Sequence, residues 1–231
     1  TDRDLIGLIH EGRKMLGDAI PMAIDFGYRW HNWHDALFLL DRVADADIFF
    51  AEATLQHDDL AGHARLAEKS SIRIGGAEAA ATRFEVREWL TTAKVGVVQP
   101  NIGRAGGLTE IRRIADMCEL AGAEIVPHGW KTGITSAAGR HFQAACPAAP
   151  VFEYVSPLVF DSPLRRELVS PEPTVVDGFM ELPTGPGLGV EIDREKLGNI
   201  RLHMGDAIEV LERLPDASLD RVYLLHPDPW P

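Results

Sequence analysis

The chain has 231 residues, of which 45% are hydrophobic and 25% are charged, and its formal net charge is −12. This length and composition allow a sizeable core in one or two globular domains. The acidic balance argues against the basic surface with which proteins attract nucleic acid or anionic membranes without specificity.

No apolar run approaches the roughly 18 residues of a membrane-spanning helix, and no signal peptide precedes the first residue. We therefore expect a cytoplasmic protein. Cys118 and Cys146 stand alone, without a Cys-x-x-Cys spacing. They are expected to be buried thiols in a reducing compartment, not a disulfide or a metal site.

Strand-like and helix-like segments alternate along most of the chain. Apolar periodicity first predicts an amphipathic helix over residues 2–16. The strands expected after it are 21–25, 48–52, 72–76, 95–99, 124–127 and 151–154. The expected helices are about 32–45, 58–69, 82–92, 108–122 and 133–146. This series predicts a parallel α/β sheet. It has six strands where a closed barrel needs eight, so two strands would precede Thr1.

The sequence changes character twice after this series. Residues 155–197 contain many prolines and a turn-rich 186–189 stretch, which predicts a tail that packs back over the barrel. Residues 199–204 and 220–225 then read as short strands with a helix over 207–214 between them. The second of these strands ends in His-Pro-Asp-Pro-Trp-Pro.

Three acidic residues each follow an apolar run. Asp25, Glu52 and Glu78 are spaced 27 and 26 residues apart, about the length of one βα unit of a barrel. Equal steps would place one carboxylate at the C-terminal end of each of three successive strands. There the carboxylates would repel each other unless a divalent cation lay between them, and oxygen ligands suit Mg²⁺. Each acid alone could equally be a helix N-cap or a solvated loop residue.

Three further polar residues follow or close the later strands: Asn101, His128 and Glu153. A histidine beside a metal can act as a general acid or base near neutral pH. Taken alone, His128 would more often be a hydrogen-bonded structural residue. Its place after Pro127 at a strand end favours a functional role.

Residues 1–197 resemble the mandelate racemase branch of the enolase superfamily. The similar motifs are the runs 52–59, 76–78 with 82–84, 99–110, 127–128 and 186–189. The resemblance implies an incomplete TIM barrel of the enolase C-terminal type, in which a proton α to a carboxylate is removed and a metal stabilises the enediolate. The usual outcome is dehydration or epimerisation of an acid sugar. The implied site residues are Asp25, Glu52 and Glu78 for Mg²⁺, and His128, Asn101 and Glu153 for catalysis, with His128 as the acid or base. Glu153 and Arg83 are implied for substrate binding.

The sequence departs from that family in three respects. Asn101 stands in place of a carboxylate, and an amide can orient an imidazole but stabilises the imidazolium less well. His128 is therefore expected to be a weaker base, although it could assist hydroxyl departure as an acid. Thr54 replaces a proline, which is a minor change. The family's Lys-x-Lys strand and capping domain would lie before Thr1, so we expect little or no turnover by this chain.

The last segment, 198–231, resembles a different family, the tRNA (guanine-N7) methyltransferases. Residues 199–207 and 226–231 carry the similarity, which implies that Asp206 and Asp228 serve S-adenosylmethionine binding and catalysis. The glycine-rich first strand of such a Rossmann-like fold is missing. We therefore interpret 198–231 as a βαβ fragment joined near 197/198, with tRNA methylation as the alternative function.

Two other possibilities stay open at this stage. One is a protein without catalytic activity. The other is a homo-oligomer, because an incomplete barrel would expose strand edges that favour association. The expected partner is a small carboxylate substrate, with tRNA only under the alternative. Stabilisation by Mg²⁺ would support the first function, and stabilisation by S-adenosylmethionine the second.

Overall fold

The structure is a computed structural model, and it describes residues 1–129, 132–161 and 163–193. The predicted boundary at 197/198, the βαβ segment after it, Asp206 and Asp228 lie outside the described residues.

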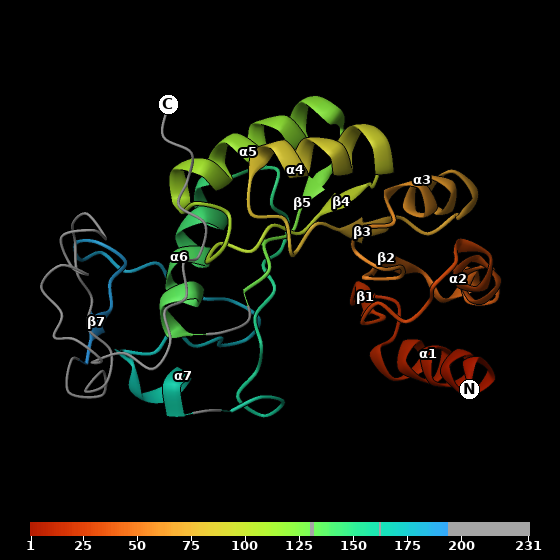
Figure 1. Cartoon of the computed structure of the whole chain (residues 1–231). Coiled ribbons are helices and arrows are strands. Elements are labelled where there is room, and N and C mark those ends of the chain that lie inside the picture. Colours follow the sequence, from red (N-terminus) through yellow and green to blue (C-terminus); the bar gives the residue numbers. More distant parts are fainter. Residues whose placement is uncertain (130–131, 162, 194–231) are drawn as a thin grey trace, which may run out of the picture.

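The described residues contain a curved sheet of five parallel strands that neighbour each other in chain order (Figure 1). Its helices lie on the outer side of the arc. The parallel α/β arrangement predicted from the sequence is confirmed. The strands are β1 (Met22–Asp25), β2 (Ile48–Glu52), β3 (Ile74–Gly76), β4 (Val97–Val98) and β5 (Glu124–Ile125).

Capping residues explain where several helices begin. Asn32, Asp59 and Thr82 each accept a hydrogen bond from a backbone N–H of the first turn. The helices before the final segment are α1 (Asp2–Leu16), α2 (Trp33–Leu40), α3 (Leu60–Lys69), α4 (Arg83–Glu88), α5 (Leu108–Ala121) and α6 (Gly133–Ala145).

Two predicted helices are interrupted. The helix expected over 32–45 ends at Leu40, and a 3-10 turn, η1 (Ala44–Ala46), follows it. Asp47 then adopts a left-handed φ of 48°, which turns the chain into β2. The helix expected over 82–92 changes into a π-helical segment, η2 (Trp89–Ala93).

A single large cluster of buried side chains fills the space between the sheet and the helices. Its most deeply buried members include Leu39, Leu66, Ile111 and Ile125. Cys118 belongs to it, and both Cys118 and Cys146 are buried and unpaired, as predicted. Burial raises the pKa of the Cys118 thiol to about 12.

The prediction of a strand over 151–154 is wrong. In the described chain these residues run irregularly, and Glu153 N–H donates to the Pro127 carbonyl over 3.2 Å. Pro127 has no N–H with which to continue a ladder, so regular pairing stops there. The described sheet therefore has five strands where six were expected.

The segment after residue 160 packs against α6, as the sequence predicted. Leu188 O accepts a hydrogen bond from Arg140 Nη2 at 3.0 Å and lies 3.3 Å from the His141 ring. The segment contains α7 (Pro163–Glu167) and an antiparallel pair, β6 (Val169–Ser170) with β7 (Glu191–Ile192). Among the described residues, none of the helices has the length and apolar character that crossing a membrane requires.

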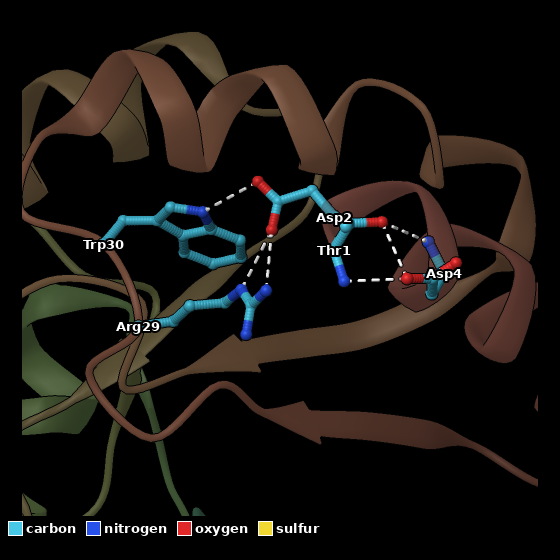
Figure 2. A network of polar contacts seen from close by, with 5 residues as sticks. All are labelled: Thr1, Asp2, Asp4, Arg29 and Trp30. Atoms are coloured by element: carbon cyan, nitrogen blue, oxygen red, sulfur yellow. Dashed lines mark hydrogen bonds and ion pairs between the residues drawn. The ribbon is translucent and has the colours of Figure 1, made fainter.

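A polar network ties the start of α1 to the loop after β1 (Figure 2). Asp2 Oδ1 accepts from Arg29 Nε and Nη2 at 3.0 and 2.9 Å, and Asp2 Oδ2 accepts from Trp30 Nε1 at 3.4 Å. Trp30 N–H also donates to Thr54 O, which extends the contact between the β1 and β2 chains beyond the strands. The loop that follows Asp25 is thus held on both sides.

Candidate active site

The predicted carboxylates lie at the C-terminal ends of neighbouring strands. Asp25 and Glu52 face each other in the β1–β2 register, and Glu52 in turn faces Gly75 of β3. Glu78 lies in the turn directly after β3. Asn101 and His128 follow β4 and β5 and form an isolated parallel bridge with each other. This is the end of a parallel sheet at which α/β enzymes place their active sites.

Unusual backbone conformations accompany these residues. Ala53, directly after Glu52, has a φ of 47°, and Ala77, directly before Glu78, has a φ of 78°. Tyr28, three residues after Asp25, has a φ of 59°. Left-handed backbone at a residue other than glycine costs about 1 kcal/mol or more and concentrates at functional sites. The chain thus keeps these strand ends in a strained geometry.

Glu52 carries the strongest sign of crowded negative charge. It is only 6% exposed, and burial raises its pKa to about 8. The charges of Glu153, Asp25 and Glu78 raise it as well. The Gln99 amide favours the charged form, although neither of its polar atoms makes a hydrogen bond of normal geometry within the described residues. A cation at this point would relieve the repulsion.

A cavity of about 350 Å³ lies beside these groups. Its polar lining consists of Asp25, Glu52, Gln99 and Glu153. The rest of the lining is largely apolar, with Phe49, Phe50, Phe152 and valines 126 and 151 among its residues. A mostly apolar cavity with a few converging polar groups is the usual form of a small-molecule site.

Tyr28 is a site residue that sequence reasoning missed. Its hydroxyl donates to Glu78 Oε1, and burial together with this bond raises the pKa of the phenol. Gln56 Nε2 donates to Tyr28 O at 2.7 Å and holds the backbone. The other carboxylate oxygen, Glu78 Oε2, lies 3.3 Å from His128 Nε2. Glu78 therefore lies between Tyr28 and His128.

The structure brings His128 and Glu153 together, with His128 Nε2 3.9 Å from Glu153 Oε2. Asn101 Nδ2 lies 2.7 Å from His128 Nδ1, and Asn101 Oδ1 accepts from Gly103 N–H at 2.9 Å. The segments that contain Gly129 and Glu153 approach closely, since a Cβ atom at Gly129 would lie 2.2 Å from Glu153 O. Only glycine allows this approach without a backbone shift.

Arg83 lies in a different environment. It occupies the first turn of α4, where its Nη1 donates to Glu110 Oε2 of α5 at 3.1 Å. Its guanidinium also lies 5.2 Å from the centre of the Phe84 ring. The structure engages Arg83 between two outer helices, and its assignment to substrate binding stays a prediction.

The carboxylate set suits Mg²⁺ in its chemistry. All donors are oxygens, and the partnerless Gln99 amide is a buried polar group beside them. Among the described side chains, however, no three acidic, histidine or cysteine groups already surround one point. Glu78 is turned toward Tyr28 and His128, so it would have to rotate to join Asp25 and Glu52.

Fold and site together are those of an α/β domain whose polar residues gather at the carboxyl ends of parallel strands. The chain belongs to the enolase C-terminal domain-like family, whose model matches residues 3–196. It is similar to D-galactarolactone cycloisomerase of Agrobacterium fabrum, with 32% identity over 195 residues that cover 82% of this chain and 51% of the relative. Arabinonate dehydratase of Saccharolobus solfataricus is 28% identical over 180 residues, which cover 78% of this chain and 47% of that relative.

A crystal structure of a candidate racemase is also similar, with a TM-score of 0.81 and 46% identity. The match covers 87% of this chain and 53% of that one. The chain spans about half the length of the curated relatives that it matches in this family. These proteins are named as a cycloisomerase, a dehydratase and a racemase, which are enzymes of the lyase and isomerase classes.

The end of the chain has a second similarity. A methyltransferase family model matches residues 188–231. The tRNA (guanine-N(7)-)-methyltransferase of Zymomonas mobilis is 64% identical over 45 residues, which are 20% of each protein. The resemblance of the last segment to that family, predicted from its motifs, is confirmed.

Proposed function

We propose that the chain is part of a Mg²⁺-dependent enzyme that removes a proton α to the carboxylate of an acid sugar, as a dehydratase or as a racemase or epimerase. The observation that carries this proposal is that Asp25, Glu52 and Glu78 lie at or directly after the ends of consecutive strands, with Asp25 and Glu52 lining the cavity. The curved parallel sheet with outer helices supports the interpretation of residues 1–197 as part of a TIM barrel.

The site residues would divide the work as follows. Asp25, Glu52 and Glu78 would hold Mg²⁺, which when bound stabilises negative charge on the substrate's carboxylate oxygens. Glu153 lines the cavity and would contact the substrate carboxylate. His128 would act as acid or base, in an orientation set by Asn101. The identity of the sugar acid is not part of the proposal.

Magnesium binding can be tested on the chain as it is. Thermal unfolding with and without Mg²⁺ should show stabilisation of the wild type and a loss of that shift in Asp25→Asn. Glu124→Gln is the matched control. Glu124 is paired with Arg73 at 2.6 Å and lies at the start of β5, at the opposite end of the sheet from the site. A shift of equal size in Asp25→Asn would contradict the proposed metal site.

Turnover is a separate test. Incubation of the Mg²⁺-loaded chain with a panel of acid sugars would detect dehydration through the keto acid product and epimerisation through the exchange of the α-proton with solvent deuterium. We expect little or no turnover by this chain, and any activity that it has should disappear in His128→Gln. A turnover that is unaffected by that substitution would contradict the role proposed for His128.

A second candidate function rests on the 64% identity of the last segment to a tRNA methyltransferase. Under it, Asp206 and Asp228 would serve S-adenosylmethionine binding and catalysis, with tRNA as the partner. Thermal stabilisation by S-adenosylmethionine, lost in Asp206→Ala, would favour this function. Absence of that shift together with a shift by Mg²⁺ would favour the first function.

A further inference from the structure

A chain of hydrogen bonds determines which ring nitrogen of His128 carries the proton. Gly103 N–H donates to Asn101 Oδ1 at 2.9 Å, so the amide oxygen is occupied and the NH₂ group points the other way. That NH₂ group lies 2.7 Å from His128 Nδ1. An amide nitrogen can only donate, so Nδ1 must accept. In a neutral imidazole the other nitrogen, Nε2, then carries the hydrogen.

The surroundings of Nε2 agree with this assignment. Glu78 Oε2 lies 3.3 Å from it and Glu153 Oε2 3.9 Å from it, on the side of the ring away from Asn101. Ionised carboxylate oxygens only accept hydrogen bonds, so they favour an N–H at this position and disfavour a lone pair. Two independent contacts, one on each nitrogen, therefore point to the same tautomer.

Burial prevents the amide from simply turning over. Asn101 is only 1% exposed and the His128 side chain 15%. A rotation of the amide by half a turn would bring its NH₂ group against Gly103 N–H and would leave both donors without an acceptor. An unsatisfied buried donor costs about 1–3 kcal/mol, which is enough to fix the orientation.

We propose that Asn101 and Gly103 are positioning residues that hold His128 as the Nε2–H tautomer, so that it meets the substrate as a hydrogen-bond donor. This inference rests on the proposed function and narrows its substrate class. A donor suits an oxygen that gains negative charge, such as a hydroxyl on the carbon next to the acidic one. As that C–O bond breaks, its electron pair goes to the oxygen. The neutral imidazole keeps its proton and stabilises the departing hydroxide by a hydrogen bond, and solvent protonates the hydroxide to water. Removal of a proton from the same face would need an acceptor. The site thus favours β-hydroxy acid sugars that lose water over acids that are epimerised.

Nuclear magnetic resonance of the full chain with ¹⁵N-labelled histidine tests the tautomer directly. Long-range ¹H–¹⁵N spectra would be recorded without metal or substrate, about two pH units above the ordinary imidazole pKa of roughly 6.5. The chain has nine histidines, so comparison with His128→Gln assigns the signals. We expect an unprotonated Nδ1 and a protonated Nε2. A protonated Nδ1 would overturn the proposal.

Asn101→Asp tests whether the Asn101 amide determines the tautomer of His128. A carboxylate accepts from Nδ1–H, so the proton should move from Nε2 to Nδ1. Asn32→Asp is the matched control, because Asn32 Oδ1 caps α2 by accepting from Asp35 N–H at 3.0 Å, and this change should leave the His128 signals unchanged. A folded Asn101→Asp protein that keeps the Nε2–H tautomer would refute the positioning role. If this variant does not fold, the wild-type spectrum still decides the assignment.

The spectra involve neither Mg²⁺ nor substrate. A wrong tautomer would therefore leave the Mg²⁺ shift and its loss in Asp25→Asn untouched, and the absence of a Mg²⁺ shift would leave the tautomer result standing.

Discussion

The two sides of the site differ in how well their polar groups are satisfied. On the β1–β3 side, Asp25, Glu52 and Glu78 gather negative charge around a buried carboxyl whose pKa is raised to about 8. On the β4–β5 side, Asn101 and His128 form a continuous hydrogen-bonded chain that starts at a backbone N–H.

This difference means that the two sides of the site are organised to different degrees before any ligand binds. The hydrogen-bonded side is already organised without a ligand, because each donor meets an acceptor. The carboxylate side is held together at an electrostatic cost that only a cation or a proton can remove. Tyr28 and Glu78 join the two, since Glu78 contacts both the tyrosine hydroxyl and His128.

The largest effect is expected where the organised side depends on close backbone approach. In Gly129→Ala the new Cβ atom would lie 2.2 Å from Glu153 O and 2.5 Å from the Phe152 ring. The free energy of unfolding should fall by roughly 4 kcal/mol, measured by urea denaturation. Gly7→Ala is the control, because nothing lies within 4 Å of its Cβ position in α1. Similar losses in both variants would mean that the approach at Gly129 is not what matters.

Glu52→Gln addresses the strain of the carboxylate side. A carboxyl whose pKa is raised in the folded state stabilises the fold below its ordinary value of 4.5, and this contribution is lost as the pH rises through about 8. The metal-free wild type should therefore lose a few kcal/mol across that window, and Glu52→Gln should not. The measurement is denaturation at a series of pH values. Glu68→Gln, at an exposed position, should behave as the wild type. A wild type with a flat profile would speak against crowded charge at Glu52.

Tyr28→Phe tests the link between the two sides. It removes the hydroxyl that donates to Glu78, and the free energy of unfolding should fall by about 1 kcal/mol. Tyr154→Phe is the control, since the Tyr154 hydroxyl donates to Pro173 O over a longer 3.3 Å. An equal or greater loss of unfolding free energy in the control would contradict a specific role for the Tyr28 hydroxyl in the site.

The smallest effect concerns the outer support of the Tyr28 loop. Asp2→Asn weakens the bonds to Arg29 and Trp30 shown in Figure 2, at a cost of about 0.5 kcal/mol because the pair is partly exposed. The hydrogen bond from Arg29 holds the pKa of Asp2 below its usual range. The difference between wild type and variant should therefore be present above pH 4 and disappear as the pH falls further. Asp18→Asn, on an exposed residue outside the network, should change neither the free energy of unfolding nor its pH dependence.

Local pattern was sufficient for the elements with clear boundaries. The predicted strand 48–52 coincides with Ile48–Glu52, and the predicted helix 2–16 with Asp2–Leu16, because each is an apolar pattern bounded by polar residues. The 151–154 segment has the same apolar start but no regular partner, since Pro127 cannot donate to it. That outcome depends on a neighbour far along the chain, which local pattern does not contain.

The site residues divide in the same way, into those that local pattern indicates and those that depend on distant neighbours. The sequence indicated the strand-end residues through their spacing, whereas Tyr28, Gln99 and Gly103 were missed. Tyr28 contacts Glu78 from a left-handed backbone position, and Gln99 is buried beside Glu52. Local pattern contains neither feature. Gly103 had a readable signal, since an asparagine followed two residues later by glycine is typical of a turn in which the side chain accepts the backbone N–H.

The two buried thiols make the helical layer accessible to kinetic measurement. Cys118 lies inside α5, and Cys146 is the C-cap residue directly after α6. With the pKa of Cys118 raised to about 12, alkylation must wait until the thiol reaches solvent. The rate at which each cysteine is labelled in native buffer would time the opening of its own helix. The two cysteines are thus internal probes of local unfolding, at helices next to the His128 side of the site.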